Sequence, residues 1–150
     1  MEENIFSRQL LFFGKEGQEK IETIHAGIVG FGGIGSYVVQ QLAYLGVRRY
    51  TIIENDVVEA SNLNRLIGAS IRDVDLPTRK CEVAEKMIYA IRPEKECEVN
   101  MISEKFPSKG SLDALKAADI LFGCVDRDGP RLVLIEFSSA YEKPYRSEEH

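Results

Sequence analysis

Four glycines near the start of the chain are spaced as in loops that bind phosphate groups. Gly30, Gly32 and Gly35 form the pattern GxGxxG, with Gly33 inside it. The pattern follows the apolar run Ala26–Val29 and precedes residues with helical spacing, which is the context that a nucleotide-binding turn requires. Glycine permits a tight turn and a close approach to phosphate, and the following helix N-terminus offers unpaired N–H groups. The pattern therefore predicts a nucleotide-binding turn; a tight connection without a ligand is the alternative.

Charged side chains follow the glycine turn at intervals that suit a nucleotide site. Glu54 ends the second predicted strand, where an acidic residue commonly accepts hydrogen bonds from ribose hydroxyls. Arg65 lies eleven residues later in a polar loop, Lys80 begins the next predicted helix, and Asp126 ends the fourth predicted strand. Because ligands of open parallel sheets bind at the carboxyl edge, we expect these side chains to converge beside the turn. The alternatives are an ordinary strand-end, loop or helix-start charge for Glu54, Arg65 and Lys80, and a turn-forming residue for Asp126.

Two cations and a carboxylate at this edge favour a triphosphate over a nicotinamide cofactor. Cations neutralise phosphate oxygens, and a carboxylate holds Mg²⁺ against them. Hydride transfer requires neither group. The sequence therefore favours ATP with Mg²⁺, whereas the glycine pattern by itself leaves an NAD-dependent oxidoreductase open.

Strands and helices that would position these residues alternate along the chain. Apolar runs predict strands over Ala26–Val29, Arg49–Glu54, Cys97–Ile102 and Ile120–Val125. Helical spacing predicts helices over Gly33–Leu45, from Arg79 or Lys80 to Pro93, over Ser111–Asp119 with Ser111 as N-cap, and over Arg131–Tyr141. The alternation predicts an α/β, Rossmann-like, doubly wound fold, with a mainly parallel sheet and helices on both faces.

The two ends of the chain extend this fold. We expect residues 1–25 to form a helical N-terminal arm, with a helix over about Ile5–Ile24 that Gly14 and Gly17 interrupt. We expect residues 26–150 to form the ATP-binding domain. The residues "KPY" would begin a fifth strand, but the chain runs out in "RSEEH", so we expect this domain to be truncated at its C-terminal end.

Composition narrows the function classes. The formal net charge of −5 argues against broad nucleic-acid binding, which needs a basic surface. No apolar stretch is long enough to cross a bilayer, and the N-terminus does not have the pattern of a secretory signal. Three cysteines without a CxxC pair, Cys81, Cys97 and Cys124, predict reduced thiols in a cytoplasmic protein, without a disulfide framework or a zinc site. We interpret Cys124 as a buried strand residue and not as a thioester-forming one.

The segments "SRQLLFFGKEGQEK", "GIVGFGGIG", "SNLNR", "PTRK" and "GCVD" occur in this order and at fitting intervals. With them the chain resembles the adenylating domain of the E1-like enzymes, the group of ThiF, MoeB and the ubiquitin activators. The resemblance spans nearly the whole chain and is far more specific than the glycine turn by itself. Family members activate the C-terminal carboxylate of a ubiquitin-like protein by adenylation, using ATP with Mg²⁺.

The resemblance implies a role for each matching residue. The nucleotide loop would be formed by Gly30, Gly32, Gly33 and Gly35. Glu54 would take the ribose position, and Asp126 would bind Mg²⁺. The phosphates would be contacted by Asn62, Arg65 and Lys80. Arg8 matches an arginine that reaches the phosphates of the neighbouring subunit, which would make a homodimer part of the site.

This sequence departs from the family's pattern in three respects. The ribose position usually holds Asp and here holds Glu54, and Arg127 stands where the family often has Asn. Family members also usually continue well beyond this point. The additional part ordinarily supplies more sheet, the groove for the protein substrate, and often a zinc cluster and a crossover loop.

Adenylation is consistent with the lack of a recognisable general base. The two histidines are His25, which precedes the first strand, and His150, which is terminal. A carboxylate substrate is already ionised near pH 7 and needs no deprotonation. The task of the protein is then alignment and neutralisation of charge.

We therefore expect ATP-dependent adenylation of a ubiquitin-like or sulfur-carrier protein, by a transferase of the ThiF and MoeB type. The alternatives are adenylation of a carboxylate on a modified tRNA base, an NAD-dependent oxidoreductase, and a non-catalytic nucleotide-binding module. Whether so short a chain is active by itself is left open by the sequence.

Overall fold

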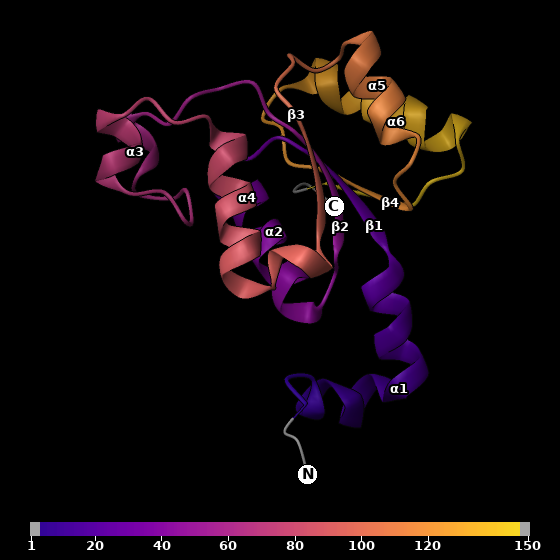
Figure 1. Ribbon diagram of the computed structural model, residues 1–150. Helices are drawn as coiled ribbons and strands as arrows, with labels where there is room; N and C mark the ends of the chain where they lie inside the picture. The colour runs from indigo at the N-terminus through magenta and orange to yellow at the C-terminus, as the bar shows by residue number, and fades with distance from the viewer. Residues whose placement is uncertain (1–3, 148–150) are drawn as a thin grey trace.

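Five parallel strands form one sheet in the computed structural model, which describes residues 4–147. The strand order is β3-β2-β1-β4-β5, which places the first strand at the centre (Figure 1). The strands are β1 (His25–Val29), β2 (Arg49–Ile53), β3 (Glu98–Ile102), β4 (Ile120–Gly123) and β5 (Tyr145–Ser147). All five residues of β1 are buried, as expected for a strand that is covered on both faces. The predicted Rossmann-like α/β class is confirmed.

Helices cover both faces of the sheet (Figure 1). The α-helices are α1 (Ser7–Thr23), α2 (Gly33–Leu45), α3 (Ile71–Asp75), α4 (Lys80–Ile91), α5 (Lys109–Leu115) and α6 (Asp128–Ala140). Two short 3₁₀ segments are η1 (Ala60–Asn62) and η2 (Glu94–Glu96). Buried side chains of α2 and α4 pack on one face, and those of α5 and α6 pack on the other.

Alternation along the strands assigns neighbouring residues to opposite faces of the sheet. Ile28 and Ile52 belong to the core under α2 and α4, whereas Val29 and Ile53 belong to the core under α5 and α6. This follows from the period of two in strand side chains. The two cores fix the strand register, and the register brings the last residues of β1, β2 and β4 to the same edge.

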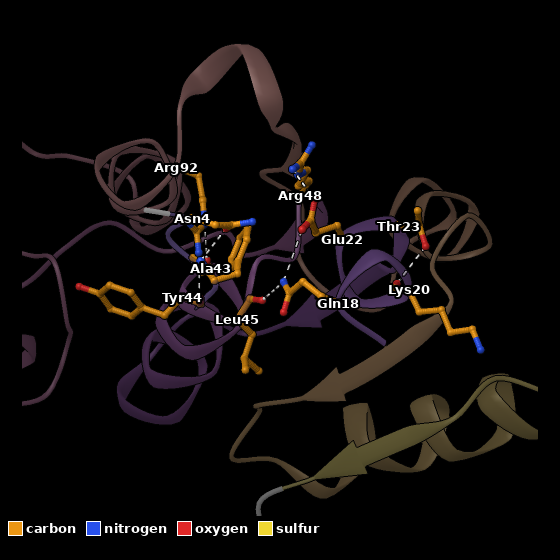
Figure 2. A network of polar contacts seen from close by, with 11 residues as sticks. Asn4, Gln18, Lys20, Glu22, Thr23, Ala43, Tyr44, Leu45, Arg48 and Arg92 are labelled. Carbon is orange, nitrogen blue, oxygen red and sulfur yellow. Dashed lines mark hydrogen bonds and ion pairs between the residues drawn. The ribbon is translucent and has the colours of Figure 1, made fainter. Parts of the chain in front are cut away.

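Helix α1 packs against the C-terminal end of α2 (Figure 2). Gln18 Nε2 donates to the Leu45 carbonyl at 2.9 Å. Arg92 donates from Nε to Ala43 at 2.9 Å and from Nη2 to Tyr44 at 2.8 Å, and its guanidinium lies 4.4 Å from the Phe6 ring centroid. These contacts satisfy carbonyl groups that a helix end leaves unpaired. They place α1 at the amino edge of the sheet; the division into an arm of residues 1–25 and a domain of residues 26–150 stays a prediction.

Several element boundaries differ from the sequence-based expectation. Ser108, and not Ser111, caps α5: the Ser108 side chain accepts from the Ser111 N–H at 3.1 Å. Helix α6 begins at Asp128, since proline at position 130 is tolerated in a first helical turn. Gly14 breaks α1 with φ of 67°, as predicted, but the prediction was wrong for Gly17, which stays helical.

The C-terminal segment forms the fifth strand that "KPY" predicts. Strand β5 pairs in parallel with β4 over Tyr145–Ser147. His150 and the last two residues before it lie outside the described residues. In the part of the chain that the structure describes, no helix is both long and apolar enough to cross a membrane.

His25 gives the fold a predicted pH dependence. It is 4% exposed, and its Nε2 lies 2.9 Å from Thr51 Oγ1. Its buried Nδ1 has no hydrogen-bond partner within residues 4–147. Burial, followed by the charge of Arg49, lowers the pKa of His25 below 6.5. As the pH falls, His25 therefore takes up a proton in the unfolded chain before it does so in the folded chain. The contribution of neutral His25 to folding stability is complete above pH 6.5 and is lost as the pH falls through the lowered pKa.

We expect the urea concentration at the unfolding midpoint of the wild-type protein to be lower at pH 5.5 than at pH 7.5. In His25→Gln the fall should be smaller, because Gln has no proton to gain. Equal pH dependence of the two proteins, followed by circular dichroism, would contradict the assignment.

Candidate functional site

The glycine turn between β1 and α2 is held by two neighbouring strands. The Gly30 N–H donates to the Ile53 carbonyl of β2 at 2.9 Å. A Cβ on Gly30, whose φ is 93°, would lie 2.5 Å from the Cys124 carbonyl oxygen beyond β4. A Cβ on Gly35 would collide with the carbonyl oxygen of Gly30. Both glycines are therefore required by backbone packing.

Gly32 faces open space, in contrast to Gly30 and Gly35. A Cβ at this position would have no atom of the described residues within 4 Å, apart from its neighbours in the chain. Gly32 is also the N-cap of α2, and no side chain of the described residues caps this helix end. An uncapped helix N-terminus with room in front of it is suited to bind an anion, because its N–H groups and dipole favour negative charge.

Glu54 links the glycine turn to the loop after β2. Its Oε2 accepts from the Phe31 N–H at 2.7 Å, and its Oε1 accepts from the Asp56 N–H at 2.9 Å. The Glu54 carboxylate thus bridges the turn and the loop after β2. A carboxylate has about four acceptor positions, so two remain for ribose hydroxyls. The ribose role of Glu54 stays a prediction.

Arg65 lies against the glycine turn. The position of a Cβ on Gly33 is 3.3 Å from Arg65 Cγ and Cδ, so the aliphatic part of Arg65 packs on the turn. Its Nη1 donates to the Ser61 carbonyl at 2.8 Å and to Asn64 Oδ1 at 3.0 Å. These are neutral acceptors, and the guanidinium keeps its full charge available for a phosphate at the turn.

Asn62 has a structural task in the same loop. It is buried, and its Oδ1 accepts from the Glu59 N–H at 2.9 Å within a capping box on η1. This hydrogen bond shapes the turn that carries Arg65. Contact between Asn62 and phosphates, which the family resemblance implies, stays a prediction.

Lys80 begins α4 at the same edge and pairs with Asp56, an acid outside the set predicted from the sequence. Lys80 Nζ lies 3.2 Å from Asp56 Oδ2, and the Lys80 N–H donates to the Asp56 carbonyl at 3.0 Å. The Lys80 side chain is 12% exposed and that of Asp56 is 71% exposed. The acidic residue two positions after Glu54 was the sequence signal that could have identified this pair.

Asp126 follows β4 beside the turn. The Cys124 N–H donates to the Val29 carbonyl at 2.8 Å, and Asp126 is exposed two residues further on. Among residues 4–147, no group of three or more potential metal ligands is present. Mg²⁺ commonly binds through one or two carboxylates together with substrate phosphates and water. Asp126 would hold the ion in that way; its role stays a prediction.

Arg8 lies away from these residues. It is exposed on α1, between Phe6 and Gln9, and Gln9 Nε2 donates to the Tyr44 carbonyl near the C-terminal end of α2. The glycine turn is at the other end of that helix, which is about 20 Å long for its 13 residues. Arg8 is therefore too distant to act on a nucleotide bound to its own chain.

Two further residues at the carboxyl edge, Ser36 and Arg131, are outside the set predicted from the sequence. Ser36 Oγ accepts from the Ile67 N–H at 3.1 Å and thereby ties α2 to the loop that carries Arg65. Arg131 Nε donates to the Val125 carbonyl at 3.0 Å, next to Asp126. The hydrogen bond between Ser36 and Ile67 joins residues 31 positions apart and therefore has no local sequence signal.

A hollow of about 390 Å³ lies at the opposite, amino edge of the sheet, near Glu22, Arg48, Lys95 and Glu98. None of the predicted site residues lines it. Arg48 pairs with Glu22 there, and Arg49 with Glu98. The carboxyl edge is the better candidate because it combines unpaired helix N–H groups with cations and open space.

Known proteins include relatives of this chain. The model of the ThiF family matches residues 6–147. The sulfur carrier protein adenylyltransferase of Thermus thermophilus is 31% identical over 141 residues, which are 93% of this chain and 51% of that protein. The chain spans about half the length of this relative.

Solved structures show the same fold. The E. coli tRNA N6-threonylcarbamoyladenosine dehydratase in complex with AMP has a TM-score of 0.85 and 26% identity, over 95% of this chain and 56% of that one. The same dehydratase has also been solved in complex with ATP. E. coli MccB with AMPCPP and MccA has a TM-score of 0.84 and 27% identity, over 98% of this chain and 44% of that one.

Two glycine substitutions should separate ligand binding from folding. In Gly32→Ala the methyl group enters the open space in front of the turn, so we expect about tenfold weaker ATP binding, with stability changed by about 0.5 kcal/mol or less. In Gly35→Ala the methyl group meets backbone, so we expect a loss of stability of about 1–3 kcal/mol or more. Calorimetric titration and urea unfolding measure the two effects. Unchanged ATP affinity in Gly32→Ala would argue against a nucleotide at this turn.

Proposed function

This chain belongs to the ThiF family, and from that premise we propose that it uses ATP to adenylate the C-terminal carboxylate of a ubiquitin-like or sulfur-carrier protein. The observation that carries the proposal is the packing of Arg65 on Gly33. It sets a cation directly at an uncapped helix N-terminus, where a phosphate would bind. The similarity to a sulfur carrier protein adenylyltransferase supports the choice of substrate.

The proposed reaction needs charge neutralisation and alignment more than proton transfer. An oxygen of the substrate carboxylate attacks the α-phosphorus of ATP, and the bond from that phosphorus to the β-phosphate bridging oxygen breaks. The products are an acyl adenylate and pyrophosphate, with no proton gained or lost in the displacement. The N–H groups of α2, Arg65 and Lys80 would bind the phosphates and stabilise the negative charge that shifts onto the leaving group. Mg²⁺, held by Asp126, would supply further neutralisation of the phosphate oxygens.

A second substrate class also has support from the comparisons. The similarity to the tRNA N6-threonylcarbamoyladenosine dehydratase, solved with ATP, supports adenylation of a carboxylate on a modified tRNA base. The net charge of −5 disfavours it, because binding of a nucleic acid depends on cations that neutralise phosphates. The protein carrier is therefore the first choice.

A homodimer would complete the proposed site. Arg8 is too far from the glycine turn of its own chain and would reach the phosphates of a partner chain. The adjacent apolar side chains support an interface there: Leu11 is 89% exposed and Phe12 is 83% exposed on the same helix. Burial of such residues in a symmetric interface is favourable.

Removal of single charges should abolish catalysis without unfolding the protein. We expect Arg65→Ala to lower ATP–pyrophosphate exchange by about 10³-fold or more, the effect of removing an arginine that neutralises phosphate charge. Asp126→Ala should also lower the exchange strongly, because the proposed ligand of Mg²⁺ is lost. Both residues are exposed, so circular dichroism spectra and urea midpoints should stay close to those of the wild type. Near-normal exchange in both variants would contradict the site assignment.

The same assay distinguishes the substrate classes. Exchange that requires a carrier protein with a free C-terminal carboxylate supports the proposal, and a carrier with an amidated C-terminus is the matched control. Exchange that requires modified tRNA would favour the second substrate class. Tight NADH binding without exchange would favour an oxidoreductase.

Mixing two inactive variants should restore activity if Arg8 acts on the partner chain. We expect Arg8→Ala and Arg65→Ala to be inactive separately. An equal mixture should recover roughly a quarter of the wild-type exchange, because half of the dimers are mixed and each mixed dimer has one complete site. No recovery in mixtures that exchange subunits, checked by native mass spectrometry, would contradict action across the interface.

A further inference from the structure

We propose that Asp56 is a positioning residue, an internal counter-anion that holds the Lys80 ammonium at the phosphate site and competes with phosphate for it. The inference deepens the proposed function and depends on Lys80 binding phosphate. Its basis is the ion pair between Lys80 Nζ and Asp56 Oδ2, at 3.2 Å. Within residues 4–147, Asp56 is the one carboxylate at ion-pair distance from this ammonium.

The two partners of this pair have very different access to water. The Lys80 side chain is 12% exposed, so its charge lies largely within the protein, whereas the Asp56 carboxylate is 71% exposed. A cation with so little access to water is unfavourable without a negative partner. Lys80 also begins α4, and a cation is disfavoured at a helix N-terminus. Lys80 therefore needs an anion, and Asp56 supplies it when no phosphate is bound.

The backbone fixes the two residues relative to one another. The Lys80 N–H donates to the Asp56 carbonyl at 3.0 Å, and the Val58 N–H donates to the Thr78 carbonyl at 2.8 Å. Val57 and Arg79 form an antiparallel bridge between these two hydrogen bonds. The two segments are thus held side by side as a short ladder, and Lys80 does not need to search for Asp56.

Glu54 connects this ladder to the glycine turn. Its carboxylate accepts from the Asp56 N–H and from the Phe31 N–H, at 2.9 Å and 2.7 Å. The chain of contacts therefore runs from the turn through Glu54 and Asp56 to Lys80. The ammonium is fixed relative to the same turn against which Arg65 packs.

The unequal exposure suits an exchange of anions. A phosphate oxygen can replace the Asp56 carboxylate at Lys80 while the carboxylate turns into water and the ammonium stays in place. When pyrophosphate leaves, the carboxylate can return to Lys80. Asp56 thus weakens the binding of ATP and pyrophosphate somewhat and speeds the release of pyrophosphate.

Asp56→Asn tests this exchange. We expect ATP and pyrophosphate to bind about two- to fivefold more tightly, the range for an ion pair with one partner in water, with no change in AMP affinity. In ATP–pyrophosphate exchange, KM for ATP and kcat should both fall, because substrate binds more tightly and pyrophosphate leaves more slowly. Glu82→Gln is the matched control, because it also removes one negative charge near Lys80, here from the first turn of α4. Within the described residues Glu82 forms no ion pair with Lys80.

A double-mutant cycle with Lys80→Met tests whether Asp56 acts through Lys80. If Asp56 acts through Lys80, Asp56→Asn should leave ATP affinity unchanged in the Lys80→Met protein. The effect of Asp56→Asn should also persist in EDTA. Weaker ATP binding in Asp56→Asn, an equal effect in the Lys80→Met protein, or an effect that requires Mg²⁺ would each overturn the proposal. Because the cycle is measured by titration calorimetry, it remains informative even if no substrate supports exchange and the proposed function fails.

Discussion

Backbone atoms of three adjacent strands meet at Gly30, where no side chain fits. The Gly30 N–H donates to the end of β2, and its Cα faces the carbonyl of Cys124 beyond β4. This close approach directs the chain into α2 at a fixed angle and points the uncapped helix N-terminus at open space above the sheet. The charged residues act at this edge only because the turn is held there. The two apolar cores maintain the strand register on which this approach depends.

Each cation beside the turn has a partner within the protein that does not prevent it from binding a phosphate. Arg65 is held by neutral acceptors and by packing on Gly33, so its charge stays available. Lys80 is held by the exposed Asp56 carboxylate, which water can solvate when a phosphate replaces it. A site of this kind is organised before the nucleotide arrives, which lowers the cost of ordering side chains on binding. Preorganised charge is also what a displacement at phosphorus requires.

Local sequence patterns predicted most elements because each pattern has a local physical cause. The range predicted for α2, Gly33–Leu45, matches the structure, because apolar spacing and Gly46 define both ends. The cap of α5 was misplaced, because Ser108 and Ser111 are both capping residue types and only the backbone path decides between them. Gly17 was expected to interrupt α1 and does not; the helical propensity of glycine is a weak preference that neighbouring residues can override.

The sequence by itself determined the parallel sheet, the glycine turn and the candidate charges, because these follow from residue type and from spacing over a few positions. Only the tertiary structure decided which charges meet. Asp56 and Lys80 are 24 positions apart, and Arg65 reaches Gly33 from 32 positions away. It also placed Arg8 at the opposite end of α2 from the turn. Such contacts depend on how α1, α4 and the loop before α3 pack on the sheet. That packing minimises the free energy of the whole chain and has no signature in any single segment.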